Sequence, residues 1–589
     1  MSRRVACVAF GAAFLASARA APTKKLEQAP SCDILIAGGS LASLAAALTA
    51  ANASLLLSPS APASVCLLEI TDWLGGQATA SGTSAIDLGS TWQAFPANLP
   101  RAFADALTSA ALGPADFNPG GCTVSKKCFL PQLFSSWADA AAAALPNLRV
   151  LRSTAVHGVA RDHATGRIVR VSAVTRTPTA AHASGWDRLL SAALPDWYSP
   201  TDSEYFTKSV VDFEVPANGG VVIEGTEFGD VLLLGDLNVT QGGEEDEASA
   251  APARQSCGQA TTVCFWTSWG ASAAPSPDPW PPGSDGGHAI PSFVPSSPTG
   301  SLPFSLTWRR SLAADPADVK TPRVGDVALL NGGLVDSNDE DYAYVFLPVE
   351  EARASAALGA YAGGVDLLAL AMAEARAYAF YHHIVAALPA NLPAAVGFLT
   401  LNASAAGTQT GLAKMPYLRD TRRGAAGLGG FRLCHFFAAP NGTGPGPAGC
   451  GLGSAGEPGP AGYGWHWNDT IALGSYDFDI HRMKSCELPP YLYFCYPNCS
   501  VGLPYYLPWR ALTHMQAPNL LLAGKTMSQS FYANAITRLH PSEWSSGAAA
   551  GAGAALMAAR AWSSADVFDN VGVLQDLLVK VGVPIEWTL

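Results

Sequence analysis

SCDILIAGGSLASLAAALTAANASLLLSPSAPASVCLLEITDWLGG, residues 31–76, is the stretch that decides the fold. Its first apolar run, residues 34–37, has the length and composition of a strand that is buried on both faces. A glycine pair then predicts a tight turn, and residues 41–52 predict a helix rich in alanine and leucine. A second strand is expected over residues 65–68. The stretch therefore predicts a β-α-β unit at the start of an α/β fold.

The turn of this unit is a glycine-poor version of the dinucleotide fingerprint G-x-G-x-x-G, with serine at two of the three glycine positions. In such a turn the backbone N–H groups and the helix N-terminus bind a pyrophosphate, and an acid after the second strand binds a ribose. Ser40 could add a hydroxyl to the phosphates. An ordinary buried β-α-β unit without a ligand is the alternative. The candidate cofactor residues here are Gly38, Gly39, Ser40, Leu41, Ala42, Ser43 and Glu69.

Composition limits the possible functions of the 589-residue chain. Apolar residues make up 49% and charged residues 14%, so the chain can bury a large core, and its length favours more than one domain. A formal net charge of −12, without a basic run, argues against a nucleic-acid partner. No apolar run is long enough to predict stable insertion into a membrane. A small-molecule substrate is the expected partner.

The N-terminus predicts export. Two arginines at positions 3–4, an apolar run over residues 5–15 and Ala18-Arg19-Ala20 form a signal peptide, residues 1–20, so we expect a secreted protein or one in the secretory lumen. Six N-x-S/T sequons fit a glycosylating pathway; they lie at Asn52, Asn238, Asn402, Asn441, Asn468 and Asn498. The close pairs Cys122/Cys128, Cys257/Cys264 and Cys495/Cys499 are candidate disulfides. No cysteine or histidine spacing predicts a metal site.

After Glu69 the chain continues with DWLGGQATASG, residues 72–82. GGSLAS, an acid 31 residues after Gly38 and this glycine-rich segment together resemble the exported and bacterial FAD-dependent oxidoreductase family, which has a glutathione-reductase-like FAD domain. The resemblance implies FAD as the cofactor, with Glu69 at the adenosine ribose and Gly75, Gly76 and Gln77 against the flavin. A further segment, GVVIEGTEFGD at residues 220–230, resembles the family's IDAT-x-x-GD. It implies that Thr226 closes over the cofactor; a helix cap is the alternative.

Two later segments carry the candidate catalytic residues. MPYLRDTRR, residues 415–423, resembles the family's PY-x-R-E-x-R-R, with Asp420 in place of its glutamate. Three clustered arginines suit an oxyanion, although a solvated surface loop is the alternative. The run over residues 469–481 resembles D-x-I-x-x-G-x-Y-x-x-D-x-H, and its last acid and histidine would share one side of an extended segment. The candidates are His481 as acid or base, Asp479 as its orienting partner, and Arg419, Arg422 and Arg423.

The C-terminal part predicts the other half of the FAD site. PNLLLAGK, residues 518–525, predicts a buried strand and turn, and residues 545–559 predict a glycine-rich helix whose N-terminus would face the flavin pyrimidine ring. The family commonly has arginine at the position of Lys525, and His540 replaces an apolar residue. The resemblance implies cofactor contacts at Gly524, Lys525, Arg538, Ser546 and Gly547.

We therefore predict an α/β fold: a Rossmann-like, glutathione-reductase-type parallel sheet with helices, and an inserted α+β substrate or capping domain. The expected FAD domain comprises residues 31–240, with an insert at 177–206, and residues 505–589. The capping region is 241–504, with long loops at 269–303 and 440–464. A hairpin is expected around DHATGR at residues 162–167.

The predicted activity is hydride transfer between an anionic small molecule and flavin N5. One alternative is a flavin-containing lyase or isomerase that acts on a sugar acid. The other is a secreted glycoprotein that keeps the fold without catalysis, which the serines of the fingerprint motivate.

Overall fold

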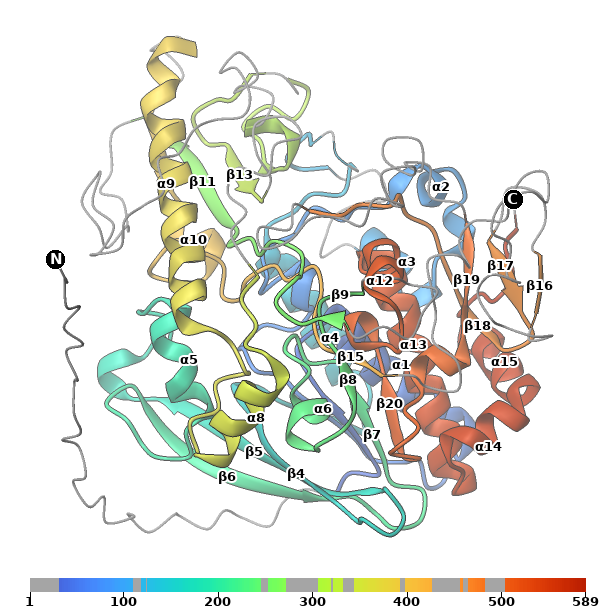
Figure 1. Cartoon of the computed structure of the whole chain (residues 1–589). Coiled ribbons are helices and arrows are strands. Elements are labelled where there is room, and N and C mark those ends of the chain that lie inside the picture. The colour runs from blue at the N-terminus through green and yellow to red at the C-terminus, as the bar shows by residue number, and fades with distance from the viewer. Residues whose placement is uncertain are drawn as a thin grey trace, which may run out of the picture.

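The structure is a computed structural model (Figure 1). It describes residues 31–109, 118–122, 124, 126–244, 253–271, 306–318, 321–331, 344–391, 398–425, 456–458, 464–481 and 504–588. The predicted signal peptide and most of the two predicted long loops lie outside these residues. Within the described part, no helix has the length and hydropathy needed to cross a membrane.

A five-stranded parallel sheet forms the centre of the molecule. Its order is β20-β7-β1-β2-β3, with β20 at Leu520–Leu522, β7 at Val221–Glu224, β1 at Ile34–Ala37, β2 at Val65–Leu68 and β3 at Leu148–Leu151. All residues of β1, β2, β7 and β20 are buried, as their continuous apolar runs predict. Segments almost 500 residues apart in sequence thus share one sheet, and the predicted parallel sheet is confirmed.

Two small-residue helices pack against each other beside this sheet. α1 (Leu41–Leu57) and α13 (His540–Arg560) approach so closely that a Cβ at Gly547 would lie 2.1 Å from the Ala42 carbonyl oxygen. A Cβ at Gly551 would lie 2.3 Å from the carbonyl oxygen of Ala46. The helix pair therefore fastens the C-terminal segment onto the first β-α-β unit, and it explains the glycines of α13.

A three-stranded antiparallel sheet follows the first part of the fold, in the order β4 (Thr154–Arg161), β5 (Ile168–Pro178) and β6 (Phe206–Glu214). The hairpin predicted around DHATGR is the β4–β5 connection. Helix α5 (Leu190–Tyr198) is inserted between β5 and β6.

The inserted elements form a second sheet and two helices. The sheet has the order β12 (Arg310–Leu312), β13 (Val327–Leu330), β11 (Phe265–Gly270) and β14 (Phe398–Leu401), with antiparallel neighbours. Helices α8 (Val349–Ala357) and α9 (Leu367–Asn391) accompany it, and α9 rises along the edge of the molecule in Figure 1.

The other helices and strands have at most 13 residues each. They are α2 (Gly89–Ala94), α3 (Arg101–Thr108), α4 (Pro131–Ala143), α6 (Asp230–Leu234), α10 (Ala403–Ala406), α12 (Phe531–Thr537), α14 (Ser564–Asp569), α15 (Val571–Lys580), β8 (Val239–Thr240), β9 (Gly243–Glu244), β10 (Ala253–Arg254), β15 (Arg423–Gly424), β16 (Gly456–Pro458), β17 (Trp465–Trp467), β18 (Thr470–Gly474) and β19 (Tyr505–Pro508).

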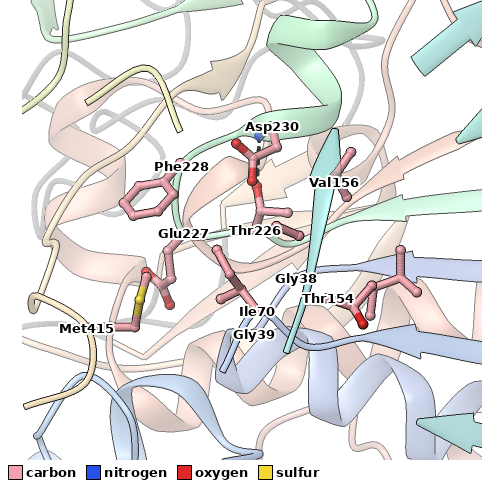
Figure 2. Close-up of a pocket in the computed structure, with 12 residues that line it drawn as sticks. Gly38, Gly39, Ile70, Thr154, Val156, Thr226, Glu227, Phe228, Asp230 and Met415 are labelled. Atoms are coloured by element: carbon pink, nitrogen blue, oxygen red, sulfur yellow. Dashed lines mark hydrogen bonds between the residues drawn. The ribbon is translucent and has the colours of Figure 1, made fainter. Parts of the chain in front are cut away.

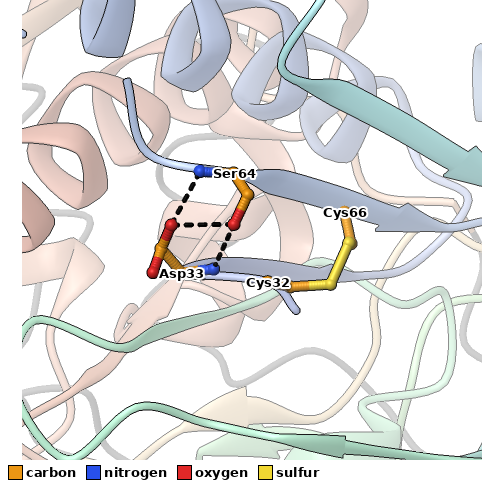
Figure 3. Close-up of a disulfide and its surroundings, with 4 residues drawn as sticks. All are labelled: Cys32, Asp33, Ser64 and Cys66. Atoms are coloured by element: carbon orange, nitrogen blue, oxygen red, sulfur yellow. Dashed lines mark hydrogen bonds between the residues drawn. A yellow bond between two sulfur atoms is a disulfide. The ribbon is translucent and has the colours of Figure 1, made fainter. Parts of the chain in front are cut away.

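A disulfide that the sequence analysis missed joins the first two strands. Cys32, just before β1, is bonded to Cys66 in β2, and beside it Asp33 Oδ2 accepts hydrogen bonds from the N–H and hydroxyl of Ser64 at 2.8 and 2.7 Å (Figure 3). The two cysteines are 34 residues apart in sequence, and only the parallel pairing of β1 with β2 brings them together.

Of the predicted disulfides, Cys122–Cys128 is confirmed. The pairing Cys257–Cys264 is wrong: Cys257 is disulfide-bonded, whereas Cys264 takes part in no disulfide. Cys495 and Cys499 lie outside the described residues.

Candidate cofactor and active site

The predicted pyrophosphate loop follows β1 directly. Gly38 has a φ of +141°, and a Cβ there would lie 2.4 Å from the Gly225 carbonyl oxygen, so the position requires glycine. At Gly39 a Cβ would lie 2.5 Å from Oε1 of Glu69. The loop thus brings its backbone against the carboxyl ends of β2 and β7, where ligands bind in folds of this kind.

The two serines of the fingerprint stabilise the start of α1 through hydrogen bonds. Ser40 is its N-cap, with Oγ accepting the N–H of Ser43 at 3.1 Å, and Ser43 Oγ donates to the Gly225 carbonyl at 3.0 Å. The two hydroxyl oxygens lie 3.1 Å apart. The Ser40 hydroxyl oxygen therefore caps the helix, and its contact with a phosphate stays a prediction. The first-turn N–H groups of Leu41 and Ala42, which have no acceptor within the helix, are the ones available to an anion.

A cavity with about 280 Å³ of empty space opens beside this loop (Figure 2). Its walls come from the loop, from the end of β2, from the start of β4 and from the segment after β7; the residues are Gly38, Gly39, Leu68, Ile70, Thr154, Ala155, Val156, Thr226, Glu227, Phe228, Asp230 and Met415. The contribution of β4 could not be predicted from the alternating pattern of its hairpin, because such a pattern indicates a structural element and not a ligand contact. The one feature of the sequence that could have indicated this contact is that β4 follows directly after β3.

Glu69 ends β2 beside the cavity and is 1% exposed. Its Oε1 accepts the N–H and the hydroxyl of Thr71, both at 2.8 Å, whereas no described residue donates a hydrogen bond to Oε2. Burial raises the pKa of Glu69 to about 8, although the two bonds from Thr71 oppose the shift. A carboxyl group with one oxygen available suits the predicted contact with ribose hydroxyls.

The segment after β7 closes another side of the cavity. The Thr226 N–H donates to Glu224 Oε1 at 2.5 Å, and its Oγ1 accepts the N–H of Asp230, the first residue of α6, at 2.8 Å, so Thr226 both lines the cavity and holds the start of α6. Asp230 accepts hydrogen bonds from the hydroxyls of Tyr198 and Tyr361 at 2.9 and 2.6 Å. These tyrosines come from α5 and from the segment after α8. Inserted elements therefore hold this wall.

The predicted Gly-Gly-Gln loop lies on the start of α1. Gly75 and Gly76 have φ values of +110° and +50°, and a Cβ at Gly76 would lie 2.6 Å from the Leu41 nitrogen and from the Gly39 carbonyl oxygen. A side chain at this position would cover the helix N–H groups that an anion needs.

A buried ionic cluster joins this loop to the C-terminal segment. Gln77 Nε2 donates to the carboxylate of Glu543 and, at 3.1 Å, to the carbonyl of Arg538. Lys525 Nζ lies 2.9 Å from Glu227 Oε2 and 3.6 Å from Glu543 Oε1. Burial raises the pKa of Glu543 to about 7 against the opposing charge of Lys525. For Lys525, the attraction of the two carboxylates exceeds the effect of burial and raises its pKa above the usual range.

Three other predicted cofactor residues make contacts within the protein. The Gly524 N–H donates to Ser546 Oγ at 3.0 Å, and that hydroxyl donates to the Glu543 carbonyl at 2.8 Å. Gly547 packs against Ala42 of α1, as described above. These contacts hold α13 to β20 and to α1, and direct contact of Gly524, Ser546 and Gly547 with a cofactor stays a prediction.

The predicted catalytic pair is in contact. Asp479 Oδ2 lies 3.3 Å from His481 Nε2 and accepts a hydrogen bond from Arg538 Nη2 at 2.6 Å. Arg538 Nη1 donates to the Tyr417 hydroxyl at 2.7 Å, and the His481 N–H donates to Gln259 Oε1 at 3.2 Å. Although burial alone would raise it, His481 and Arg538 hold the pKa of Asp479 well below its usual range. Arg538, predicted as a cofactor contact, thus binds the orienting carboxylate.

Comparison with known families agrees with this geometry. The family model described as FAD dependent oxidoreductase matches residues 33–185 and 204–578. The chain belongs to the FAD-dependent oxidoreductase family. The described part of the chain has a mixed α/β fold with a central parallel sheet.

Solved structures resemble the chain remotely. A FrdA variant of quinol fumarate reductase from E. coli is 10% identical, and the match covers 94% of this chain and 75% of that chain with a TM-score of 0.25. The p-nitrophenol 4-monooxygenase PnpA from Pseudomonas putida DLL-E4 is 13% identical, with 41% and 48% covered and a TM-score of 0.20. The match to AlpK covers only 38% of that chain. The comparison with curated proteins finds no match.

The residues present fit FAD. The loop glycines form a cradle that a Cβ would fill, the α1 N-terminus offers N–H groups for the diphosphate, and Glu69 beside the cavity offers an oxygen for the ribose. Lys525 and Gln77 provide polar groups on the side toward α13. Within the described ranges, no cluster of three or more histidine, cysteine or acidic residues could hold a metal ion.

The three clustered arginines are bound mainly by groups of the protein itself. Every N–H of Arg422 is used: Nε donates to Gln241, and the other donors bind the carbonyls of Phe228, Leu347, Gly363 and Gly364. No donor of Arg422 is left for a substrate, which argues against its predicted substrate-orienting role. The guanidinium instead ties the PY-x-R loop to the segment after α8.

Arg423 also serves the fold. Its Nε donates to the Gln529 carbonyl at 3.0 Å and its Nη2 to the Gly242 carbonyl at 2.8 Å. Arg419 binds the Ala260 carbonyl and Thr262 Oγ1, and it also lowers the pKa of Asp479. All three arginines are at most 2% exposed, so the alternative of a solvated loop is wrong. Arg419 remains a candidate because its charge acts on the Asp479 carboxylate.

His540, the unusual histidine of the C-terminal motif, is structural. Its Nε2 lies 3.0 Å from the Thr83 carbonyl oxygen, and its Nδ1 accepts the Asp87 N–H at 3.3 Å. Burial lowers the pKa of His540 to about 3, so the ring is neutral. A neutral ring with one donor and one acceptor satisfies both neighbours.

Proposed function

We propose that the protein is a secreted FAD-dependent oxidoreductase that transfers a hydride between an anionic small molecule and flavin N5. The observation that carries the proposal is the Asp479 carboxylate, which bridges His481 and Arg538 at 3.3 and 2.6 Å. Bound FAD supplies a two-electron acceptor for a hydride. An ionised carboxylate beside an imidazole fixes the orientation of the ring and stabilises a proton on it. His481 would accept or return the substrate proton at its other ring nitrogen, Nδ1, because Nε2 faces the Asp479 carboxylate.

Local charge supports an anionic substrate. Arg419 and Arg538 both act on the pKa of Asp479 and therefore lie within electrostatic range of it. Asp479 is partly exposed, whereas the two guanidinium groups are buried and fixed by hydrogen bonds. An anionic group on the substrate would be attracted to these fixed cations.

The test is flavin reduction in His481→Ala. A metabolite panel is first screened for compounds that bleach the flavin of the wild-type protein without oxygen. With such a compound, we expect His481→Ala to reduce its flavin about 10²-fold more slowly while it retains FAD. His182→Ala is the matched control, because His182 also pairs with an aspartate, Asp187, but on a half-buried turn outside the site. Equal reduction rates in His481→Ala and wild type would refute the role. Substrate turnover without bleaching would support the lyase or isomerase alternative.

Several observations support secretion. The disulfides Cys32–Cys66 and Cys122–Cys128 suit an oxidising compartment. The sequons at Asn52, Asn238 and Asn468 are exposed. Outside the cell, oxygen or a quinone is a more available electron acceptor than NAD(P). We expect expression in a eukaryotic secretory host to release a protein that begins after Ala20 and loses mass with an N-glycosidase. Retention inside the cell with residues 1–20 intact would contradict secretion.

A further inference from the structure

Tyr417, the tyrosine of the PY-x-R motif, has a hydroxyl proton that the fold does not use. Its oxygen accepts a hydrogen bond from Arg538 Nη1 at 2.7 Å, and among the described residues no group accepts a hydrogen bond from it. The hydroxyls of Tyr198, Tyr361 and Tyr476, in contrast, each donate to a carboxylate. An oxygen that faces an N–H donor directs its own hydrogen elsewhere. The Tyr417 proton is therefore available to a ligand.

The protein holds this side chain in one place. The N–H of Tyr417 donates to the Thr262 carbonyl at 2.8 Å, and the Thr262 N–H donates to the Tyr417 carbonyl at 3.3 Å. The Arg419 guanidinium carbon lies 4.9 Å from the centroid of the Tyr417 ring, and Arg419 Nη1 is bound to Thr262 Oγ1 at 2.8 Å. Only 6% of the Tyr417 surface is exposed. A donor fixed in this way loses little freedom when it meets an acceptor.

Arg538 connects the Tyr417 hydroxyl to the proposed catalytic pair. Its Nη1 binds Tyr417 at 2.7 Å, and its Nη2 binds Asp479 at 2.6 Å. Both nitrogens belong to one planar guanidinium, so their spacing is fixed. Asp479 in turn lies 3.3 Å from His481 Nε2. One connected set of polar contacts therefore has a hydrogen-bond donor at one end and the group proposed to move a proton at the other.

This cluster suits a substrate oxygen on which negative charge develops. The side chains of Asp479 and His481 are 38% and 14% exposed, so a small molecule can reach the pair. The hydrogen bond from the Arg538 guanidinium polarises the Tyr417 hydroxyl and makes it a better donor. When a base removes the proton of an alcohol, the oxygen becomes a stronger acceptor. A fixed donor then stabilises the transition state more than the ground state.

We propose that Tyr417 is a second catalytic residue, which donates a hydrogen bond to the reacting oxygen, and that the substrate is an anionic alcohol oxidised at the carbon that carries this oxygen. The proposal rests on the hydride transfer proposed above. In the step, the C–H bond breaks and its hydride passes to FAD, while the O–H bond breaks and its proton passes to His481. The carbon–oxygen double bond of an aldehyde or ketone forms, so the substrate loses two electrons and FAD gains them. Tyr417 keeps its proton throughout.

The class of substrate is tested on the wild-type protein with FAD bound. Glycolate, lactate and malate, together with other alcohols and with acids that lack a hydroxyl group, are screened for anaerobic bleaching of the flavin. We expect only compounds with a carbinol carbon to bleach it, and mass spectrometry to identify the matching aldehyde or ketone as the product. Bleaching by compounds without a carbinol carbon would overturn this inference and leave hydride transfer standing. Absence of bleaching by every compound would remove both.

Tyr417→Phe tests the hydroxyl, because the ring and its packing on Arg419 are retained. With a bleaching alcohol at saturation, we expect the rate of flavin reduction to fall about 10²-fold, while the half-saturating concentration changes less than about threefold. The matched control is Tyr381→Phe, which removes the hydroxyl of a buried tyrosine of α9 that is bonded to the Leu399 carbonyl. It should reduce at the wild-type rate. An unchanged rate in Tyr417→Phe would overturn the proposal.

Binding gives a second measurement that does not depend on turnover. The carbonyl product of the alcohol, pyruvate in the case of lactate, has an acceptor oxygen where the deoxy acid, propionate, has none. By ligand-observed NMR with the oxidised protein, we expect wild type to bind the carbonyl compound at least about tenfold more tightly than the deoxy acid, and Tyr417→Phe to lose this preference. A purely structural role, or a bound water at Tyr417, would change both affinities equally or neither. Either of these results would overturn the assignment.

Discussion

Arg538 holds the carboxylate of Asp479, with Nη2 and Oδ2 2.6 Å apart, and the same oxygen lies 3.3 Å from His481 Nε2. Arg538 follows α12, and Asp479 follows β18, 59 residues earlier in the chain. The guanidinium is itself fixed by the Tyr417 hydroxyl of the PY-x-R loop. Three motifs that are separate in the sequence therefore meet at this carboxylate.

Asp479→Asn tests this relationship. The change removes the negative charge that orients His481 and stabilises a proton on it, so we expect flavin reduction by substrate to slow by about 10²- to 10³-fold with FAD still bound. Stopped-flow absorbance under anaerobic conditions measures the rate. Asp477→Asn, at an exposed position two residues earlier, is the control and should reduce at the wild-type rate. A normal rate in Asp479→Asn would remove this carboxylate from the mechanism.

Gly76→Ala tests the cofactor loop. The new Cβ would lie 2.6 Å from the Leu41 nitrogen, so we expect FAD affinity to fall by at least about tenfold. Gly359→Ala carries the same backbone strain, because both glycines have positive φ (+50° and +70°), but its Cβ meets nothing within 4 Å. The FAD-to-protein absorbance ratio and reconstitution of the apoprotein measure the difference. Equal FAD content in the two variants would count against the loop as a cofactor contact.

Glu69→Gln tests the ribose contact. Glutamine can still accept both bonds from Thr71 through its carbonyl oxygen but offers an amide where the carboxylate had a second oxygen. We expect FAD to bind about tenfold or more weakly, as measured by titration of the apoprotein with FAD. An unchanged Kd would contradict the assignment of Glu69 to the ribose.

The same variant changes the pH dependence of stability. Glu69 has a pKa of about 8 in the folded chain against 4.5 as its ordinary value, so the folded state binds more protons between these values. Its contribution to stability is therefore full below about pH 4.5 and is lost as the pH rises through about 8. About pH 6 and about pH 9 lie on either side of the folded pKa of Glu69. Between them, we expect the Tm of the wild-type apoprotein to fall more than the Tm of Glu69→Gln. Parallel Tm curves would show that Glu69 is not the titrating group.

Alanine variants at the α1–α13 contact distinguish a role in helix packing from a role in cofactor binding. A Cβ at Gly547 or Gly551 would lie 2.1 or 2.3 Å from a carbonyl oxygen of α1, so we expect each alanine variant to lose about 1–3 kcal/mol of stability. Gly572→Ala, on α15 with open space around it, should instead gain about 0.5–1 kcal/mol. Thermal unfolding measures all three. If Gly547 also contacts FAD, as predicted, Gly547→Ala alone should bind FAD more weakly; equal affinity in Gly547→Ala and Gly551→Ala would leave Gly547 with packing only.

Local patterns were sufficient for the first β-α-β unit. β1 and β2 lie at residues 34–37 and 65–68, as the apolar runs predict, and α1 begins at Leu41 after the glycine pair. The Asp479–His481 contact could also be predicted, because two residues that are two positions apart in an extended segment share a side. Each of these features depends on residues that are close in sequence.

Only the tertiary structure decided what the buried polar groups bind. The carbonyl partners of Arg422 include Gly364 and Phe228, 58 and 194 residues away, and their geometry changes a predicted substrate ligand into a structural contact. The Cys32–Cys66 disulfide likewise depends on strand pairing. Sequence determined the strands, the helix start and the residue types available for a cofactor. Which donor meets which acceptor depended on the packing of distant segments, because a buried donor binds whichever acceptor the fold places within its reach.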